Sequence, residues 1–314
     1  MTSPDYSTTR RLTSEKPACF DTPVDGMQTL LKTPDSEQKI AEGGLRLQGL
    51  YKTSSEDKPL ITVVTVVYNG AEFLEETIKS VIEQTYDNVE YIIVDGGSTD
   101  GTLEIIKKYD HAIDYWVSEP DKGIYDAMNK GIDLGNGDWI NFMNAGDSFF
   151  SFYVLYNIFK FPYSGVEIIF GKSETVYKNL SAIRYSCFDI ADSFFYKKRM
   201  PNHQAVFVKK CKYKENKFRL DMPIGADTDY LLNVFSVSSF SMVDIVVSKF
   251  YLGGISSFYG SVNNLAKIIN DDIKNGRHQI ITIFLHAGKF LLQKALGRNA
   301  YLFLYLLYLR LKYK

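Results

Sequence analysis

The sequence predicts an α/β fold in which helices flank a doubly wound, mainly parallel sheet, followed by a helical, aromatic-rich C-terminal tail. Two runs, 60–68 and 91–94, are almost continuously apolar and β-branched, which is typical of strands buried on both faces. Segments with apolar residues at helical spacing, such as 71–85, separate these runs. Strands that alternate with helices imply right-handed crossovers and therefore a mainly parallel sheet.

Length and composition exclude several classes of protein. The 314 residues are enough to bury one large core, and 36 basic against 37 acidic residues argue against a nucleic-acid partner. The three cysteines, Cys19, Cys187 and Cys211, lack metal-ligand spacing, which predicts reduced thiols and no zinc site. The N-terminus has no apolar stretch of signal-peptide length, so we expect a cytoplasmic protein.

The first 58 residues differ from the rest of the chain. They are rich in Ser, Thr, Asp, Lys and Pro and show no sustained periodicity, which predicts a leader that is weakly ordered or draped over the surface. Only residues 42–51 alternate apolar and polar positions, starting at Leu45, and this stretch is a candidate for a short strand or a docking segment.

Residues 59–150 repeat a unit of strand, loop and helix. The expected strands are 60–68, 91–94, 115–117 and 139–143, and the expected helices are 71–85, 103–109 and 124–134. Parallel strands of one sheet end on the same side, so the loops that follow these strands should all lie on one rim.

The pattern is less regular after residue 150. We expect strands at 166–170, 205–208 and 243–250 and a helix that begins at Tyr230. The sequence thus divides into the leader 1–58, a domain 59–255 with halves 59–150 and 151–255, and a helical segment 256–314.

Three polar residues follow consecutive strands at this rim. Tyr68 suits stacking on a base, Asp95 suits a hydrogen bond from a ring N–H, and Asp147 suits a cation or a phosphate. Each also has a structural interpretation, because Tyr68 can cover the core, Asp95 can form a turn and Asp147 can cap a helix. The combination of all three favours a nucleotide site over the separate structural roles.

Two common nucleotide motifs are absent. The Gly-rich loop 96–101 lacks the Gly-x-Gly-x-x-Gly spacing of a dinucleotide fold, and it also lacks the Gly-Lys-Ser/Thr of a P-loop. Hydride transfer and nucleotide hydrolysis are therefore disfavoured.

The ordered motifs resemble those of family 2 glycosyltransferases of the GT-A fold. They are VVYNG (66–70), IVDGGSTDGT (93–102) and NAGD (144–147), and the stretch EPDKGIYDAMNKG (119–131) resembles a bacterial subgroup that acts in capsule, exopolysaccharide and colanic-acid-type assembly. The resemblance covers roughly residues 59–251.

This resemblance implies an inverting transfer from a nucleotide-diphosphate-sugar, UDP-linked rather than GDP-linked, to a hydroxyl of a glycan or lipid-linked sugar acceptor. The half 59–150 would bind the donor and the half 151–255 the acceptor, with Mn²⁺ or Mg²⁺ as cofactor. The nucleotide-binding residues implied are Val66, Tyr68, Asp95, Gly97, Lys122, Asp126 and Asn144.

The metal motif departs from the pattern of the family. Asp147 matches its last acid, whereas Asn144 and Gly146 stand where relatives often carry Asp, so metal binding without donor should be weak. His203 is either a further metal ligand or phosphate contact, or a histidine with a purely structural role. Lys122 and Arg199 are candidates for the donor phosphates, against the default of solvated surface charges.

The acceptor hydroxyl needs a general base. Asp227, in the stretch GADTDYLL (225–232), matches the catalytic acid of the family. Asp229 is the alternative, although either acid can instead cap the helix expected at Tyr230.

The C-terminal tail has two interpretations. Its aromatic residues and interspersed Lys and Arg suit a helix at the surface of the inner membrane, but they also suit packing on the domain. The apolar run 301–309 is too short to span a bilayer. Two rival functions remain, an idle sugar-nucleotide-binding or scaffold subunit and a nucleotidyltransferase, although the latter needs a basic Gly-rich loop that VVYNG replaces. Oligomeric state stays open.

Overall fold

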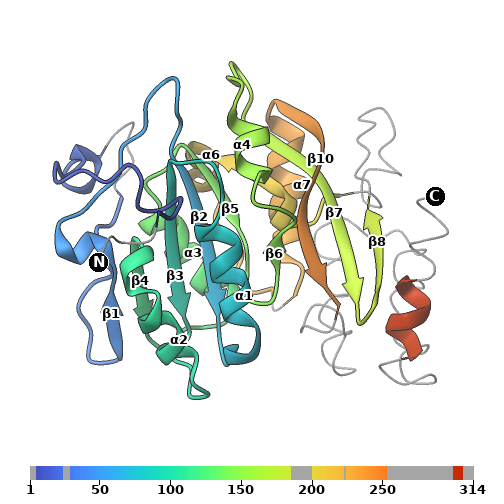
Figure 1. Cartoon of the computed structure of the whole chain (residues 1–314), viewed down its shortest axis with the longest axis horizontal. Helices are drawn as coiled ribbons and strands as arrows, with labels where there is room; N and C mark the ends of the chain where they lie inside the picture. The colour runs from blue at the N-terminus through green and yellow to red at the C-terminus, as the bar shows by residue number, and fades with distance from the viewer. Residues whose placement is uncertain (1–4, 24–28, 185–199, 223, 253–299, 307–314) are drawn as a thin grey trace.

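A mixed sheet runs through the part of the chain that the computed structural model describes, which is residues 5–23, 29–184, 200–222, 224–252 and 300–306. It has ten strands in the order β1-β4-β3-β2-β5-β9-β7-β10-β6, with β8 paired to β7 (Figure 1). The strands are β1 (Ala41–Gly43), β2 (Ile61–Val67), β3 (Val89–Asp95), β4 (Tyr115–Ser118), β5 (Trp139–Phe142), β6 (Ser148–Phe149), β7 (Ile168–Tyr177), β8 (Leu180–Arg184), β9 (Val206–Lys209) and β10 (Phe240–Tyr251).

The centre of the sheet is parallel, as the sequence predicts. Strands β4, β3, β2 and β5 are adjacent and run in the same direction, and every residue of these four strands is buried. Burial on both faces explains their continuous apolar runs. Antiparallel pairs extend this parallel centre on both sides, through β1 beside β4 and through β9 beside β5.

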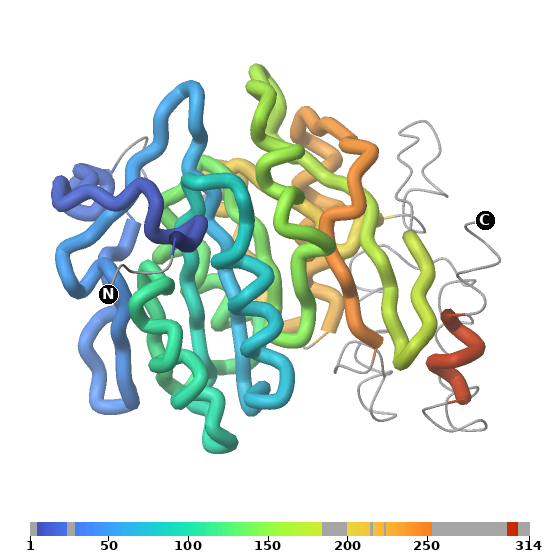
Figure 2. The backbone as a smooth tube through the Cα atoms, viewed as in Figure 1, coloured from blue at the N-terminus to red at the C-terminus, as the bar shows by residue number. Residues whose placement is uncertain are grey.

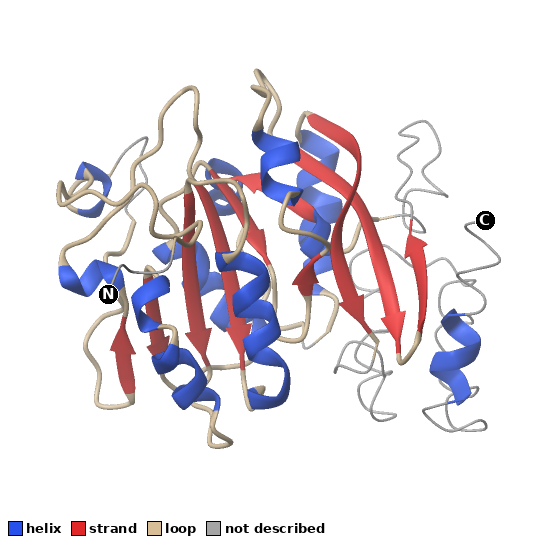
Figure 3. Ribbon diagram, in the orientation of Figure 1, coloured by secondary structure: helices blue, strands red, loops and turns tan. Residues whose placement is uncertain are grey.

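Helices cover both faces of the sheet (Figure 3). The first face carries α1 (Ala71–Ile82), α2 (Thr102–Lys108) and α4 (Val154–Phe159). The second face carries α3 (Ile124–Leu134), α6 (Lys210–Glu215) and α7 (Ala226–Val237). Gly131 of α3 lies against Val64 of β2, where any added Cβ would overlap the valine side chain, so glycine allows this helix to pack closely on the sheet.

Helix α7 begins four residues earlier than the sequence predicts. We expected its start at Tyr230, but the helix begins at Ala226, directly after Gly225 with φ +88°. Glycine adopts this conformation without strain. Asp227 and Asp229 consequently lie within the first turn, where carboxylates interact favourably with the helix dipole.

The described residues of the leader pack against the surface of the domain (Figure 2), which is the second of the two arrangements expected for residues 1–58. Strand β1 pairs with β4, and two buried ion pairs attach the leader to the sheet. Arg46 contacts Glu90 at 2.5 Å, and Lys52 contacts Asp114. The stretch from Leu45 docks as the 3₁₀ helix η2 (Leu45–Gln48) rather than as a strand. Periodicity gave no signal because irregular backbone and long-range polar contacts hold this segment.

Most of the expected helical segment 256–314 lies outside the described residues. Residues 300–306 are helical, and Tyr301, Leu302 and Leu306 pack against the β7–β8 hairpin at the end of the sheet far from the leader (Figure 2). This piece fits the packing interpretation of the tail. Among the residues described, no helix has the length and apolar character needed to cross a membrane.

Candidate active site

The polar residues expected at the rim follow strands that lie side by side. Val67 is paired with Asp95 across β2 and β3, so Tyr68 and Asp95 reach the same edge of the sheet. Strand β5 lies on the other side of β2, and the Ala145 N–H donates to the Val66 carbonyl at 3.2 Å. We call the part around β2 and β3, where nucleotide binding is expected, the nucleotide end, and the part beyond β5, which carries Asp147 and Asp227, the acid end.

Asp95 is held by its own loop and by the neighbouring strand. Its carboxylate accepts hydrogen bonds from the Ser98 N–H at 3.1 Å, from the Ser98 hydroxyl, and from the Ser118 hydroxyl at 2.6 Å. Asp95 has no exposed surface. The structural interpretation of Asp95 therefore accounts for its contacts, and the expected hydrogen bond to a base stays a prediction.

Tyr68 is open to solvent beside a pair of glycines. Its side chain is 66% exposed. A Cβ added to Gly96 would lie 3.4 Å from the Tyr68 ring and 2.6 Å from an Asp121 carboxylate oxygen. Burial raises the pKa of Asp121. Gly97 has φ +82°, which favours glycine. The exposed ring of Tyr68 thus lies next to the surface formed by Gly96 and Gly97, which we call the glycine floor. Beside it lies the carboxylate of Asp121, which the sequence did not single out.

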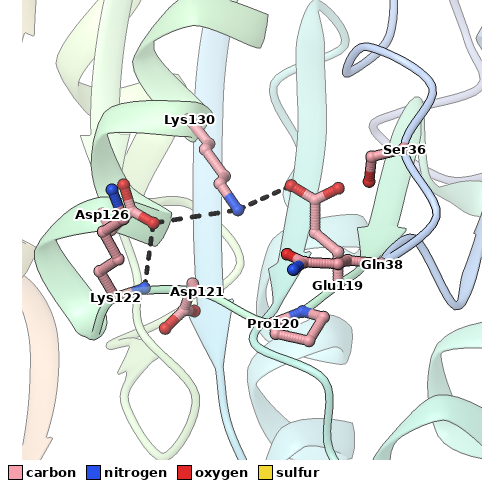
Figure 4. A pocket seen from close by; sticks show the side chains of 8 residues that line it. All are labelled: Ser36, Gln38, Glu119, Pro120, Asp121, Lys122, Asp126 and Lys130. Atoms are coloured by element: carbon pink, nitrogen blue, oxygen red, sulfur yellow. Dashed lines mark hydrogen bonds and ion pairs between the residues drawn. The ribbon is translucent and has the colours of Figure 1, made fainter.

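A cavity of about 380 Å³ lies beside this floor (Figure 4). Lys122 and Asp126, both expected to bind nucleotide, line it, and the Lys122 N–H donates to Asp126 Oδ2 at 3.1 Å. Lys130 contacts Glu119 at 2.6 Å. The complete lining is Ser36, Gln38, Glu119, Pro120, Asp121, Lys122, Asp126 and Lys130. A second cavity of about 250 Å³ lies between the start of α3 and residues 220–222, and Lys122 and Asp126 line it too.

At the acid end, His203 joins Asn144 to Asp227. His203 Nδ1 lies 2.9 Å from Asp227 Oδ2, and His203 Nε2 lies 3.1 Å from Asn144 Nδ2. An ionised carboxylate only accepts and an amide nitrogen only donates, so these partners assign the proton of a neutral imidazole to Nδ1. Both ring nitrogens are engaged, which fits a structural role for His203 better than metal ligation.

Asp227 is poised as an ionised acid. Burial acts to raise its pKa, but hydrogen bonds from His203, the Thr228 N–H and the Tyr125 hydroxyl, together with the positive charge that His203 carries when protonated, outweigh burial, so the pKa of Asp227 is lowered. The Tyr125 hydroxyl donates to Asp227 Oδ1 at 3.2 Å. A carboxylate that is ionised at neutral pH can accept a proton.

Asp147 is buried in a different environment. Burial raises the pKa of Asp147 to about 6, although the Gln204 hydrogen bond and the nearby His203 oppose this shift. The Gln204 amide donates to Asp147 Oδ2 at 2.6 Å, and the Tyr251 N–H lies 3.4 Å from Oδ1. No cation from Lys or Arg contacts Asp147 in the described part of the chain.

Asp147 and Asn144 offer side-chain oxygens of the kind that a hard divalent cation prefers, but these two residues do not form a complete set of ligands. Asn144 Oδ1 is buried without a hydrogen-bond partner, and the raised pKa of Asp147 indicates a carboxylate whose charge lacks compensation. Such oxygens suit Mg²⁺ or Mn²⁺. Within the described residues, however, no group of three or more His, Cys, Asp or Glu could hold a metal ion. The described residues thus show no metal site, and a cation at Asp147 stays a prediction.

Sequence reasoning missed some members of the acid end. Gln204 was visible only as the neighbour of His203, and Tyr125 only as part of the stretch 119–131. Asp229 is buried, and its N–H donates to the Gly225 carbonyl in the first turn of α7. Arg199 lies outside the described residues.

Comparison with known proteins gives a consistent picture. Residues 62–219 match the family model described as glycosyl transferase family 2. An uncharacterized glycosyltransferase of Mycobacterium tuberculosis is 30% identical over 204 residues, which cover 63% of this chain and 78% of the relative. TuaG of Bacillus subtilis, named for teichuronic acid biosynthesis, is 37% identical over 93 residues, or 29% of this chain and 37% of the relative.

Two solved structures share the fold. Residues 1–349 of TarS from S. aureus, in complex with UDP, give a TM-score of 0.53 and 17% identity, over 74% of this chain and 71% of that chain. The mannosyltransferase PcManGT of Pyrobaculum calidifontis, solved with GDP-Man and Mn²⁺, has a TM-score of 0.52 and 19% identity, over 72% of this chain and 67% of that enzyme.

Proposed function

Because this chain belongs to glycosyl transferase family 2, we propose that it transfers a sugar from a nucleotide-diphosphate-sugar to a hydroxyl of a glycan acceptor, with inversion at the anomeric carbon. Residues 59–150 supply the donor-binding half and residues 151–255 the acceptor-binding half. The contacts around residues 203 and 204 carry the proposal.

Two consecutive side chains, His203 and Gln204, reach two different acids. His203 contacts Asp227 at the start of α7, and Gln204 contacts Asp147 after β5. One acid has a lowered pKa and the other a raised pKa. Paired carboxylates whose environments separate their pKa values are typical of sites that divide two catalytic roles.

Asp227 acts as the general base in this mechanism. It accepts the proton of the acceptor hydroxyl while the hydroxyl oxygen attacks the anomeric carbon of the donor sugar. The bond between that carbon and the diphosphate oxygen breaks, and the electron pair leaves with the nucleoside diphosphate. A single displacement of this kind inverts the anomeric centre. His203 keeps Asp227 ionised, and Tyr125 fixes the other carboxylate oxygen.

Asp147, with the unpartnered Asn144 oxygen, would hold a divalent cation together with the donor phosphates. Bound Mn²⁺ or Mg²⁺ would stabilise the negative charge on the departing diphosphate. Ionised Asp147 itself is the residue that draws the cation to this end of the site. The Mn²⁺ present in the PcManGT structure supports this part of the proposal.

We favour a UDP-sugar as donor, and the UDP bound to TarS supports that preference, while the GDP-Man bound to PcManGT keeps GDP-sugars in the test. The name of TuaG supports an acceptor in the assembly of a cell-surface polysaccharide. In this proposal the acceptor is a lipid-linked sugar, and the transfer takes place at the cytoplasmic face of the inner membrane.

The proposal is tested by screening UDP- and GDP-sugars with the full chain, with and without Mn²⁺. We expect Mn²⁺-dependent release of nucleoside diphosphate and a rise in thermal stability with at least one donor. Donor binding without any turnover, with acceptor present, would favour the idle sugar-nucleotide-binding subunit. A complete lack of binding to every donor would contradict both functions.

A further inference from the structure

The leader contributes side chains to the nucleotide end of the site. The family model begins at residue 62, yet Ser36 and Gln38 line the 380 Å³ cavity together with Asp121 and Lys122 (Figure 4). This volume falls within the range of small-molecule sites, roughly 300–1,000 Å³. One wall of the cavity therefore comes from outside the domain shared with the family.

Hydrogen bonds fix this part of the leader in place. The Ile40 N–H donates to the Ser118 carbonyl at 2.8 Å, and strand β1 continues the pairing with β4. Lys39 Nζ donates to the Thr33 carbonyl at 3.0 Å and contacts Glu42 at 3.1 Å. The chain is thus held in place on both sides of residues 36 and 38. A fixed backbone is needed if these side chains are to discriminate between ligands.

The same segment brings an apolar side chain to the glycine floor. A Cβ added to Gly97 would lie 3.5 Å from Ile40 Cδ1, just as one added to Gly96 would lie 3.4 Å from the Tyr68 ring. Ile40 is 55% exposed and Tyr68 is 66% exposed. Two exposed apolar side chains beside adjacent glycines form a surface suited to a flat ring, since glycines allow a ligand to approach the backbone.

We propose that Ser36, Gln38 and Ile40 form the outer wall of the base pocket and select the nucleobase of the donor. This inference rests on the proposed function. Ile40 contacts the face of the base, and Gln38 offers both an amide donor and a carbonyl acceptor to its edge. Uracil presents alternating acceptors and a donor on its edge, which the Gln38 amide complements, and the proposed selection favours UDP over GDP.

The test compares the dissociation constants of UDP, GDP and inorganic pyrophosphate for the full chain and for Gln38→Ala and Ser36→Ala. Loss of a hydrogen bond to the base should weaken UDP binding roughly 3- to 10-fold and lower the preference for UDP over GDP, while pyrophosphate binding stays unchanged. Glu37→Ala is the matched control, because Glu37 is exposed on the same segment and does not line the cavity.

The outcomes separate this inference from the proposed function. If the unmodified chain binds no nucleotide, both the proposed function and the proposed base-selecting role of Ser36, Gln38 and Ile40 are rejected. If the unmodified chain binds UDP but Gln38→Ala and Ser36→Ala keep its preference over GDP, only the wall is overturned. An equal loss of UDP, GDP and pyrophosphate binding would also overturn it, because a base-selecting wall does not contact the phosphates.

Discussion

The two ends of the site are held together in different ways. At the nucleotide end the hydrogen bonds lie within one loop or join the loops that follow neighbouring strands: Asp95 accepts from Ser98 three residues on and from Ser118 23 residues on, and residues 69–71 bond residues 98–102. At the acid end several bonds join the chain before residue 150 to the chain after residue 200, such as Gln204 to Asp147 over 57 residues and Tyr125 to Asp227 over 102 residues.

The two ends of the site should respond differently to substitution, because different contacts hold them. Loops that follow neighbouring strands keep their mutual contacts when more distant packing shifts, whereas contacts between the chain before residue 150 and the chain after residue 200 depend on how these two segments pack across the sheet. Substitutions at the acid end should therefore change chemistry and proton affinity. Substitutions at the nucleotide end should produce smaller effects on local stability and donor binding.

The largest effect is expected for Asp227→Asn, which removes the proposed general base. General-base catalysis contributes typically 10²- to 10⁴-fold, so the rate of transfer should fall by about that factor while the dissociation constant of the donor changes little. Steady-state kinetics and UDP titration measure the two quantities. Asp229→Asn is the neighbouring control and should retain transfer. Normal turnover by Asp227→Asn would reject the assignment of the base.

His203→Ala tests whether the long-range contact sets the state of the base. Hydrogen bonds to charged groups are worth roughly 1.5–3 kcal/mol, so transfer at neutral pH should fall about 10- to 100-fold. His203 lowers the pKa of Asp227, and its loss raises that pKa, so the acidic limb of the pH–rate profile should move to higher pH.

His203→Gln is the control for this experiment, because an amide at residue 203 can still donate to Asp227. It should recover part of the rate and part of the pH shift. A pH profile of His203→Ala that matches the unmodified chain would show that Asp227 does not depend on His203.

Asp147→Asn should stabilise the metal-free protein at neutral pH. The folded-state pKa of Asp147, about 6, lies above the ordinary value of 3.8, so the native state binds more protons between these values and its stability falls as pH rises through the window. The variant should be more stable by about 1–3 kcal/mol at pH 7.5 and similar at pH 3.5. Urea unfolding at both pH values measures this difference.

The same variant also tests the cation. Mn²⁺ with UDP should raise the midpoint of thermal unfolding of the unmodified chain and should not raise that of Asp147→Asn. An equal rise in both proteins would argue against Asp147 as a ligand.

The smallest effect is expected at the nucleotide end. Ser98→Ala removes the hydroxyl that donates to Asp95 and accepts from the Asn69 N–H, and it should lower the free energy of unfolding by about 1–2 kcal/mol. Transfer should continue, with a modest rise in the KM for the donor. A loss of transfer as large as that of Asp227→Asn would contradict the contrast between the two ends.

Local patterns were sufficient to predict the centre of the fold. The β-branched runs predicted β2 and β3, and helical spacing predicted α1 and α3, because each of these elements buries a face that its own sequence defines. Boundaries were less accurate where a turn decides them, as at Gly225, whose conformation starts α7 earlier than the apolar pattern suggests.

The sequence by itself determined the parallel centre of the sheet and the family, and it singled out Asp147 and Asp227 as candidate acids, since strand patterns and short motifs are local properties of the chain. The tertiary structure alone decided which side chains meet those acids, His203 and Gln204, and that the leader docks beside Asp121. Contacts between segments tens of residues apart depend on crossover and packing geometry, and a one-dimensional pattern carries no record of that geometry.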